Sequence, residues 1–125
     1  MTSLMCLAVA VYFEARGESL QGQYAVAEVV MNRVADERYP DTVCGVVFER
    51  KAFSFTHDGK SDRLPNTPAS EKAMEVATNV MAGLKMGITS THYHATYVKP
   101  YWTSHFELDG KVGDHVFYTN TTRYK

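Results

Sequence analysis

The sequence has few cysteines, few prolines and no surplus of charge of either sign. Its 125 residues include two cysteines and four prolines, and 13 lysines and arginines stand against 14 aspartates and glutamates. Two cysteines cannot build a disulfide framework or, alone, a zinc site. The formal net charge of −1 argues against nucleic acid as a partner, because nucleic-acid-binding domains usually carry a basic excess.

The two cysteines leave two interpretations open. Cys6 and Cys44 can form one disulfide bridge, or both can be buried free thiols. We favour the free thiols, because free cysteine is among the most buried residue types and packs as a small hydrophobic side chain.

No hydrophobic run is long enough to cross a membrane. The longest covers residues 4–13, well short of the roughly 20 residues that a membrane-spanning helix needs. It lacks the basic start and the clear cleavage site of a secretory signal. We expect it to form a core helix of a protein that is made in the cytoplasm without a signal peptide and has no membrane partner.

Length and periodicity predict one small α+β domain over residues 1–125, and we expect a monomer. Apolar residues recur at helical spacing over residues 3–15, over 20–36 and from Thr67-Pro68 to Gly83 or Gly87. Ser19 is placed to cap the second of these helices, and Asp41 to cap a short helix that ends at Val47. Helices thus fill the first two-thirds of the chain.

The last third of the chain is predicted to be a small antiparallel sheet. Residues 89–98 are rich in β-branched and aromatic side chains. Asp109-Gly110 is a strong hairpin signal between residues 106–108 and 111–112, and the second strand would continue through 115–118.

Glu14 is the first candidate for chemistry. It continues the helical face of Leu7 and Val11, which is expected to point into the core. A carboxyl group at the mouth of an apolar face is partly desolvated, which raises its pKa and suits a general acid. The alternative is that Glu14 ends its helix and points into water.

Several other side chains have competing interpretations. Glu18 can be a second carboxylate, as many glycosidases need, or can stabilise a helix start or pair with Arg16. His92 and His94 share one face of the predicted strand and can bind zinc together with His115, His57 or Asp58, although a polar groove wall is the simpler alternative. Trp102 is a candidate for a groove wall, and Ser54 for a hydrogen bond to Glu14 or to substrate.

A series of short motifs covers nearly the whole chain. The most specific is Tyr-Phe-Glu-Ala-Arg-Gly-Glu at residues 12–18. Others follow at residues 22–23, 25–27, 29–34, 39–40, 43–47, 53–55, 58–59, 82–83, 91–95, 100–102 and 115–118. Together these motifs resemble the cell wall hydrolase family of the germination-specific spore cortex-lytic enzymes (SleB/CwlJ type).

The resemblance implies a lysozyme-like fold related to the lytic transglycosylases. It implies that Glu14 is the catalytic acid, and that the partner is the glycan strand of peptidoglycan. The bond cut would join N-acetylmuramic acid to N-acetylglucosamine and would leave a 1,6-anhydro end, with no metal or cofactor. The residues expected to contact the substrate are Ser54, His92, Tyr93, His94, Trp102 and Glu18.

Other functions stay open from the sequence. The enzyme can be a muramidase that adds water, or a zinc amidase that uses His92 and His94, or the domain can only bind glycan. A phage endolysin and a bacterial enzyme localised by a partner are both compatible contexts. Some relatives carry a tyrosine-rich run ending in asparagine at residues 92–95, so groove contacts can differ here. Some relatives also carry a cysteine where this chain has Ala52, so a local bridge from Cys44 is not available here.

Overall fold

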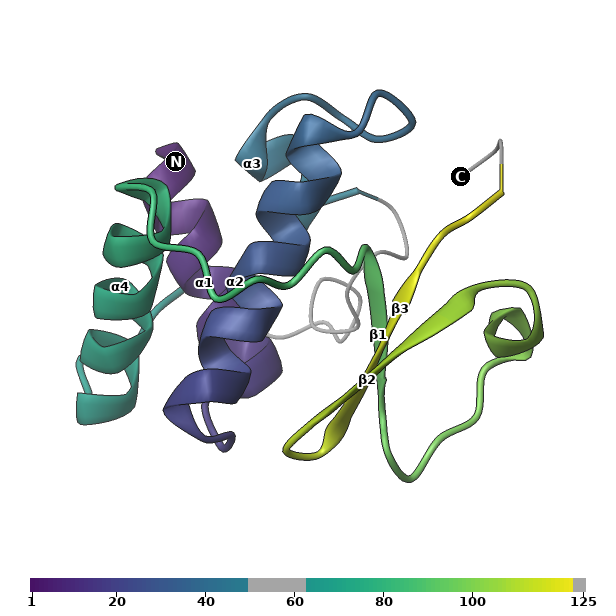
Figure 1. Ribbon diagram of the computed structural model, residues 1–125. Helices are drawn as coiled ribbons and strands as arrows, with labels where there is room; N and C mark the ends of the chain where they lie inside the picture. The colour runs from purple at the N-terminus through teal and green to yellow at the C-terminus, as the bar shows by residue number, and fades with distance from the viewer. Residues whose placement is uncertain (50–62, 123–125) are drawn as a thin grey trace.

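The computed structural model describes residues 1–49 and 63–122, and within them the chain forms helices first and strands last. Figure 1 shows the helices on one side and the sheet on the other, which confirms the predicted α+β class. None of the helices in these ranges is long and apolar enough to cross a bilayer. In chain order the elements are α1 Ser3–Ala15, α2 Leu20–Ala35, α3 Val43–Val47, α4 Pro68–Met81, β1 His92–Ala95, the 3-10 helix η2 Tyr101–Ser104, β2 Glu107–Val112 and β3 His115–Thr119.

Each α-helix begins at a side-chain cap, as short polar residues at that position allow. Ser19 accepts a hydrogen bond from the Gly22 amide, as the sequence predicts. Thr67 forms a capping box with Ser70, at the helix start that the sequence predicts. The predicted cap at Asp41 is wrong, because the hydroxyl of Thr42 accepts the Gly45 amide instead and the helix starts one residue later.

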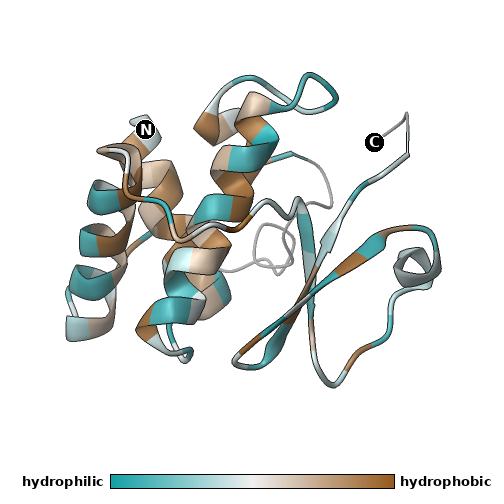
Figure 2. Ribbon diagram, in the orientation of Figure 1, coloured by the Kyte–Doolittle hydropathy of each residue, from teal (hydrophilic) through white to brown (hydrophobic). Residues whose placement is uncertain are grey.

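Helix α1 is the centre of the core. Six consecutive residues, 6–11, are at most 1% exposed, and α1 packs against α2, α3 and α4. Figure 2 shows the apolar colour along α1 and alternating apolar and polar colour along α4, which covers it from one side. Because α1 is buried on all sides, its C-terminal end at Glu14 has a fixed position.

The three strands form an antiparallel sheet in the order β1-β3-β2, with Tyr93 opposite Phe117 in the register of β1 and β3. The predicted turn at Asp109-Gly110 is wrong. These residues lie inside β2, where the register shifts between Leu108 and Gly110. The carboxylate of Asp109 accepts hydrogen bonds from the hydroxyls of Ser90 and Thr119, which keeps it within the sheet.

The true hairpin turn lies at Gly113 and Asp114, between β2 and β3. Gly113 has a φ of +58°, in the left-handed region that glycine adopts without strain. The carboxylate of Glu18 accepts a hydrogen bond of 2.9 Å from the Asp114 amide. This turn is therefore stabilised by a hydrogen bond between two residues that are 96 positions apart in the sequence.

The expectation of two free thiols is also wrong. Cys6 and Cys44 form a disulfide, with their Cα atoms 5.3 Å apart. The reason is the packing of α1 on α3, which places the buried Cys6 against Cys44. The bridge closes a ring across a sequence separation of 38 residues.

We predict that reducing the disulfide lowers the free energy of unfolding by about 2–4 kcal/mol, because the unfolded chain loses a constraint across this ring. Urea unfolding with and without a thiol reductant measures the change. The Cys6→Ala/Cys44→Ala variant is the control, since its midpoint must not respond to the reductant. Equal midpoints for oxidised and reduced wild type would contradict the prediction.

Candidate functional site

Glu14 lies next to the last residue of α1 and is half-buried. Its Oε1 accepts a hydrogen bond of 3.1 Å from the hydroxyl of Tyr93, in β1. The contact joins residues 79 apart in the sequence and connects the helices to the sheet. The structure thus places Glu14 inward, as its helical face predicts.

The surroundings of Glu14 keep its carboxyl group protonated to higher pH than usual. Burial raises the pKa of Glu14, while the hydrogen bond from Tyr93 and the positive charge of Arg33 oppose part of that rise. The net direction is upward, as an acid that donates a proton near neutral pH requires.

Tyr93 is held as a hydrogen-bond donor. Burial and the nearby negative charge of Glu14 raise the pKa of Tyr93 well above its ordinary value. Its ring packs against His115, at 4.8 Å between centroids, and against Phe117, at 5.6 Å. In the structure its hydroxyl bonds to Glu14, and the substrate contact expected of Tyr93 stays a prediction.

Arg33 is a buried cation that the sequence analysis did not single out. It is 7% exposed, and its Nε donates a 2.6 Å hydrogen bond to the carbonyl of Thr91. Burial lowers the pKa of Arg33, and the negative charge of Glu14 acts in the opposite direction. The sequence does carry a signal for this residue, because Arg33 lies within the apolar face of residues 25–34 and arginine is rarely buried unless it is paired.

Glu18 contacts the hairpin turn between β2 and β3 through its carboxylate. Its carboxylate accepts from the Asp114 amide at 2.9 Å and approaches Nδ1 of His115 at 3.6 Å, with 12% of its side chain exposed. A Cβ atom on Gly113 would lie 2.8 Å from this carboxylate. Arg16 lies 4.8 Å from the ring centre of Tyr12. These contacts hold the hairpin turn, and the substrate contact expected of Glu18 stays a prediction.

His92 and His94 share a sheet face, as predicted, on the side opposite Tyr93. Their rings lie 5.3 and 5.8 Å from the ring of Trp102. Burial, with the charges of Arg33 and Arg38, lowers the pKa of His92 to about 3, so its ring is neutral. The three side chains form an aromatic cluster with Phe106 and Tyr118.

The ligand set expected for zinc is not brought together among residues 1–49 and 63–122. Within these ranges no three His, Cys, Asp or Glu side chains gather at one point. His115 faces Tyr93, on the other side of the sheet from His92 and His94. His57, Asp58 and the candidate Ser54 lie outside the described residues.

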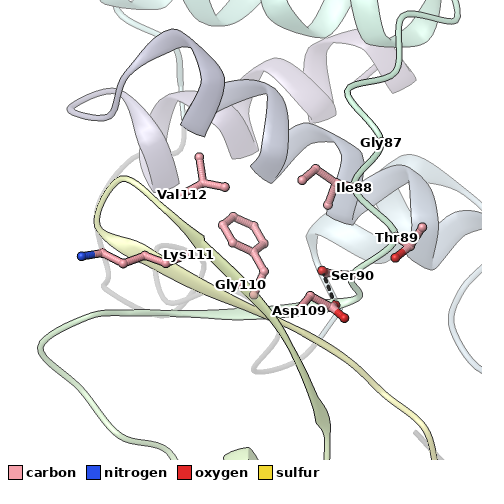
Figure 3. A pocket seen from close by; sticks show the side chains of 9 residues that line it. Gly87, Ile88, Thr89, Ser90, Asp109, Gly110, Lys111 and Val112 are labelled. Carbon is pink, nitrogen blue, oxygen red and sulfur yellow. Dashed lines mark hydrogen bonds between the residues drawn. The ribbon is translucent and has the colours of Figure 1, made fainter.

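A pocket of about 340 Å³ lies between residues 87–90 and β2 (Figure 3). Ile88, Val112 and Phe117 line it with apolar surface, and a hydrogen bond between Ser90 and Asp109 lies at one side. Lys111 points away from it (Figure 3). Glu14 is not among its lining residues, so this pocket is separate from the candidate acid.

Comparison with known proteins identifies the family. The profile of the Cell Wall Hydrolase family matches residues 17–118. The chain belongs to the cell wall hydrolase family. This confirms the resemblance seen in the motifs, and Glu14 lies three residues before the matched range.

Relatives of this cell wall hydrolase include spore cortex-lytic enzymes. That of Oceanobacillus iheyensis is 46% identical over 72 residues, which are 58% of this chain and 26% of the relative. That of Bacillus subtilis is 45% identical over 69 residues, which are 55% and 23% of the two chains. The match thus spans about a quarter of the length of these relatives.

Two solved structures share the fold over nearly the whole chain. The catalytic domain of the Bacillus cereus SleB protein is 33% identical, with a TM-score of 0.80, covering 94% of this chain and 89% of that one. The catalytic domain of the germination-specific lytic transglycosylase SleB from Bacillus anthracis is also 33% identical, with a TM-score of 0.81, over 94% and 93% of the chains. These two matches confirm the predicted α+β fold.

We predict that Tyr93→Phe raises the pKa of Glu14 further, because the phenol hydroxyl stabilises the carboxylate that remains after deprotonation. Carbon-13 NMR titration of the side-chain carboxyl of Glu14 measures this without any substrate. Tyr12→Phe is the matched control. An unchanged or lower pKa in Tyr93→Phe would show that the hydroxyl does not act on this acid.

We predict that Glu18→Ala lowers the free energy of unfolding by about 0.5–1.5 kcal/mol, because the Asp114 amide loses its acceptor. Chemical unfolding measures the loss, and Glu71→Ala, an exposed acid in α4, is the control. Full stability combined with lost substrate binding would instead support the predicted substrate contact.

Proposed function

We propose that this chain is a lytic transglycosylase that cuts the bond between N-acetylmuramic acid and N-acetylglucosamine in peptidoglycan, with Glu14 as its acid. The observation that carries the proposal is the half-buried carboxyl of Glu14, with its raised pKa and its hydrogen bond from Tyr93. Family membership supports the substrate, because the family is that of cell wall hydrolases.

The type of reaction is inferred from one solved relative. The Bacillus anthracis SleB catalytic domain is described as a germination-specific lytic transglycosylase, and its 33% identity extends over 94% of this chain. The longer spore cortex-lytic enzymes support the same class through a shorter match. The test of the reaction type is therefore the mass of the products that this chain itself releases.

In the first proposed step, Glu14 donates its proton to the glycosidic oxygen as the bond to the muramic acid breaks. The leaving N-acetylglucosamine keeps the proton as a new hydroxyl group. Positive charge develops at the anomeric carbon, where the substrate's own acetamido group can stabilise it. The Tyr93 hydroxyl and the charge of Arg33 stabilise the carboxylate that Glu14 becomes.

In the second step, the Glu14 carboxylate takes the proton from the 6-hydroxyl of the same muramic acid. The oxygen then attacks the anomeric carbon and closes the 1,6-anhydro ring. Glu14 regains its proton, and no water is consumed. One carboxyl group performs both transfers, so the position of Glu18 at the hairpin turn is compatible with this mechanism.

Two alternatives differ from this proposal in their products. A muramidase would add water to the anomeric carbon, and its product would be heavier by one water molecule. A zinc amidase would release stem peptides and would lose activity with a chelator. Release as a phage endolysin stays a prediction from the sequence.

We predict that Glu14→Gln lowers turnover of purified peptidoglycan by at least about 10²-fold, because positioned acid–base catalysis contributes factors of this size. Release of soluble muropeptides measures turnover, and circular dichroism checks that the variant is folded. Glu37→Gln, a change in the segment after α2, is the matched control. Near-normal turnover in a folded Glu14→Gln protein would overturn the role of Glu14.

Mass spectrometry of the wild-type digest tests the reaction type separately. The expected main products carry 1,6-anhydro muramic acid ends. Products heavier by one water would replace the transglycosylase with a muramidase while leaving Glu14 as the acid.

A further inference from the structure

Two aromatic side chains on one short segment after β1 are almost fully exposed. Tyr97 and Tyr101 are each 86% exposed, and Val98 between them is 44% exposed. Isolated exposed apolar residues are normal, but a contiguous exposed group marks a binding surface more often. Two tyrosines with the same high exposure within five residues therefore suggest a ligand.

The segment is held in place by hydrogen bonds of its own backbone. The Thr96 amide donates to the carbonyl of Asp114 at 2.9 Å, and the Val98 amide to that of Ala95 at 3.1 Å. The carbonyl of Pro100 accepts from both the amide and the hydroxyl of Thr103, at 3.3 and 3.0 Å. A surface fixed before binding loses little conformational entropy when a ligand arrives.

Packed aromatic rings hold the part of this segment that forms η2 against the sheet. Trp102, next to Tyr101 in η2, lies 5.4 Å from the ring of Phe106 and 5.2 Å from that of Tyr118. Because Trp102 anchors η2 on the sheet, Tyr101 is presented from a fixed base.

A short series of contacts connects this segment to the end of α1 that carries Glu14. The Glu18 amide donates to the Ala15 carbonyl at 2.9 Å, and the Glu18 carboxylate accepts from the Asp114 amide. The Asp114 carbonyl in turn accepts from Thr96, the residue before Tyr97. The two tyrosines therefore follow the end of the sheet that meets the C-terminal end of α1.

The chemistry of the segment fits a sugar polymer. Residues 96–104 contain one lysine, Lys99, and no acidic side chain. One face of a pyranose ring presents C–H groups, which pack on the electron-rich face of an aromatic ring, while a tyrosine hydroxyl can bond to sugar hydroxyls. Where the stem peptide has been removed, the muramic acid carries a free carboxylate, which Lys99 can attract.

We propose that Tyr97 and Tyr101 form a platform on which sugar rings of the glycan strand stack, outside the position where the bond is cut. The identity of the polymer rests on the proposed function. The platform would hold a long strand while Glu14 acts on one of its bonds.

The test uses the Glu14→Gln protein, so that the strand is bound but not cut. Peptide-free glycan strands from purified peptidoglycan are titrated by calorimetry, with and without Tyr97→Ala/Tyr101→Ala. The expected result is a dissociation constant about tenfold higher, as for truncation of aromatic anchors. Tyr97→Phe/Tyr101→Phe keeps both rings and is expected to bind within about twofold of the parent.

Leu84→Ala is the matched control, because Leu84 is 44% exposed and comes three residues after α4, the helix that lies farthest from the sheet (Figure 1). An unchanged dissociation constant in the double alanine variant would overturn the platform. If the double alanine variant loses affinity only for strands that carry stem peptides, the ligand is a peptide and the platform is wrong. If only its sedimentation coefficient changes, the ligand is a second copy of the chain, which also overturns the platform.

The two proposals fail in different ways. If wild type releases anhydro products and the alanine variant binds strands normally, only the platform is wrong. If the Glu14→Gln protein binds strands through the tyrosines and wild type releases no products, the platform stands and the cleavage proposal is wrong.

Discussion

Burial of α1 is the constraint on which the other elements depend. Residues 6–11 are excluded from water, and three helices pack around them. A buried helix cannot rotate or slide without exposing apolar surface or leaving voids, which close-packed interiors do not tolerate. The position of its last turn is therefore fixed, and a carboxyl group there has a definite distance to the sheet.

The polar residues at the junction of helices and sheet form a connected set around that carboxyl group. Tyr93 from β1 bonds to Glu14, while Arg33 from α2 bonds to the backbone of Thr91, next to β1. Burial favours the neutral acid, and the hydroxyl and the cation favour its anion. A group that must first give and then regain a proton benefits from such opposed influences, because neither protonation state is too stable.

Local sequence patterns predicted most of the fold. The helix periodicity located α1 and α4, and Ser19 and Thr67 acted as caps, because these features depend on neighbours within one turn. The hairpin turn was misplaced because it is selected by Glu18, from a distant part of the chain. The sequence does not predict the disulfide for a related reason, since Cys44 lies close to Cys6 only because α3 packs on α1.

The candidate site was predictable only in its central residue. The apolar face of its helix and the family motif both pointed to Glu14. The supporting role of Tyr93 and the burial of Arg33 follow from contacts between α1, α2 and β1, which no spacing in the sequence encodes. Tertiary packing places Glu18 at the hairpin turn and the two histidines in an aromatic cluster, and their expected substrate contacts stay predictions.

The disulfide between Cys6 and Cys44 closes a loop that contains residues of the candidate site as well as core residues. The ring of residues 6–44 contains Glu14, Glu18 and Arg33, all in one covalent loop. A protease that cuts a single peptide bond within this loop leaves the two fragments joined through the sulfur atoms. Glu14, the Glu18 contact to the hairpin turn and the buried Arg33 would then remain parts of one molecule.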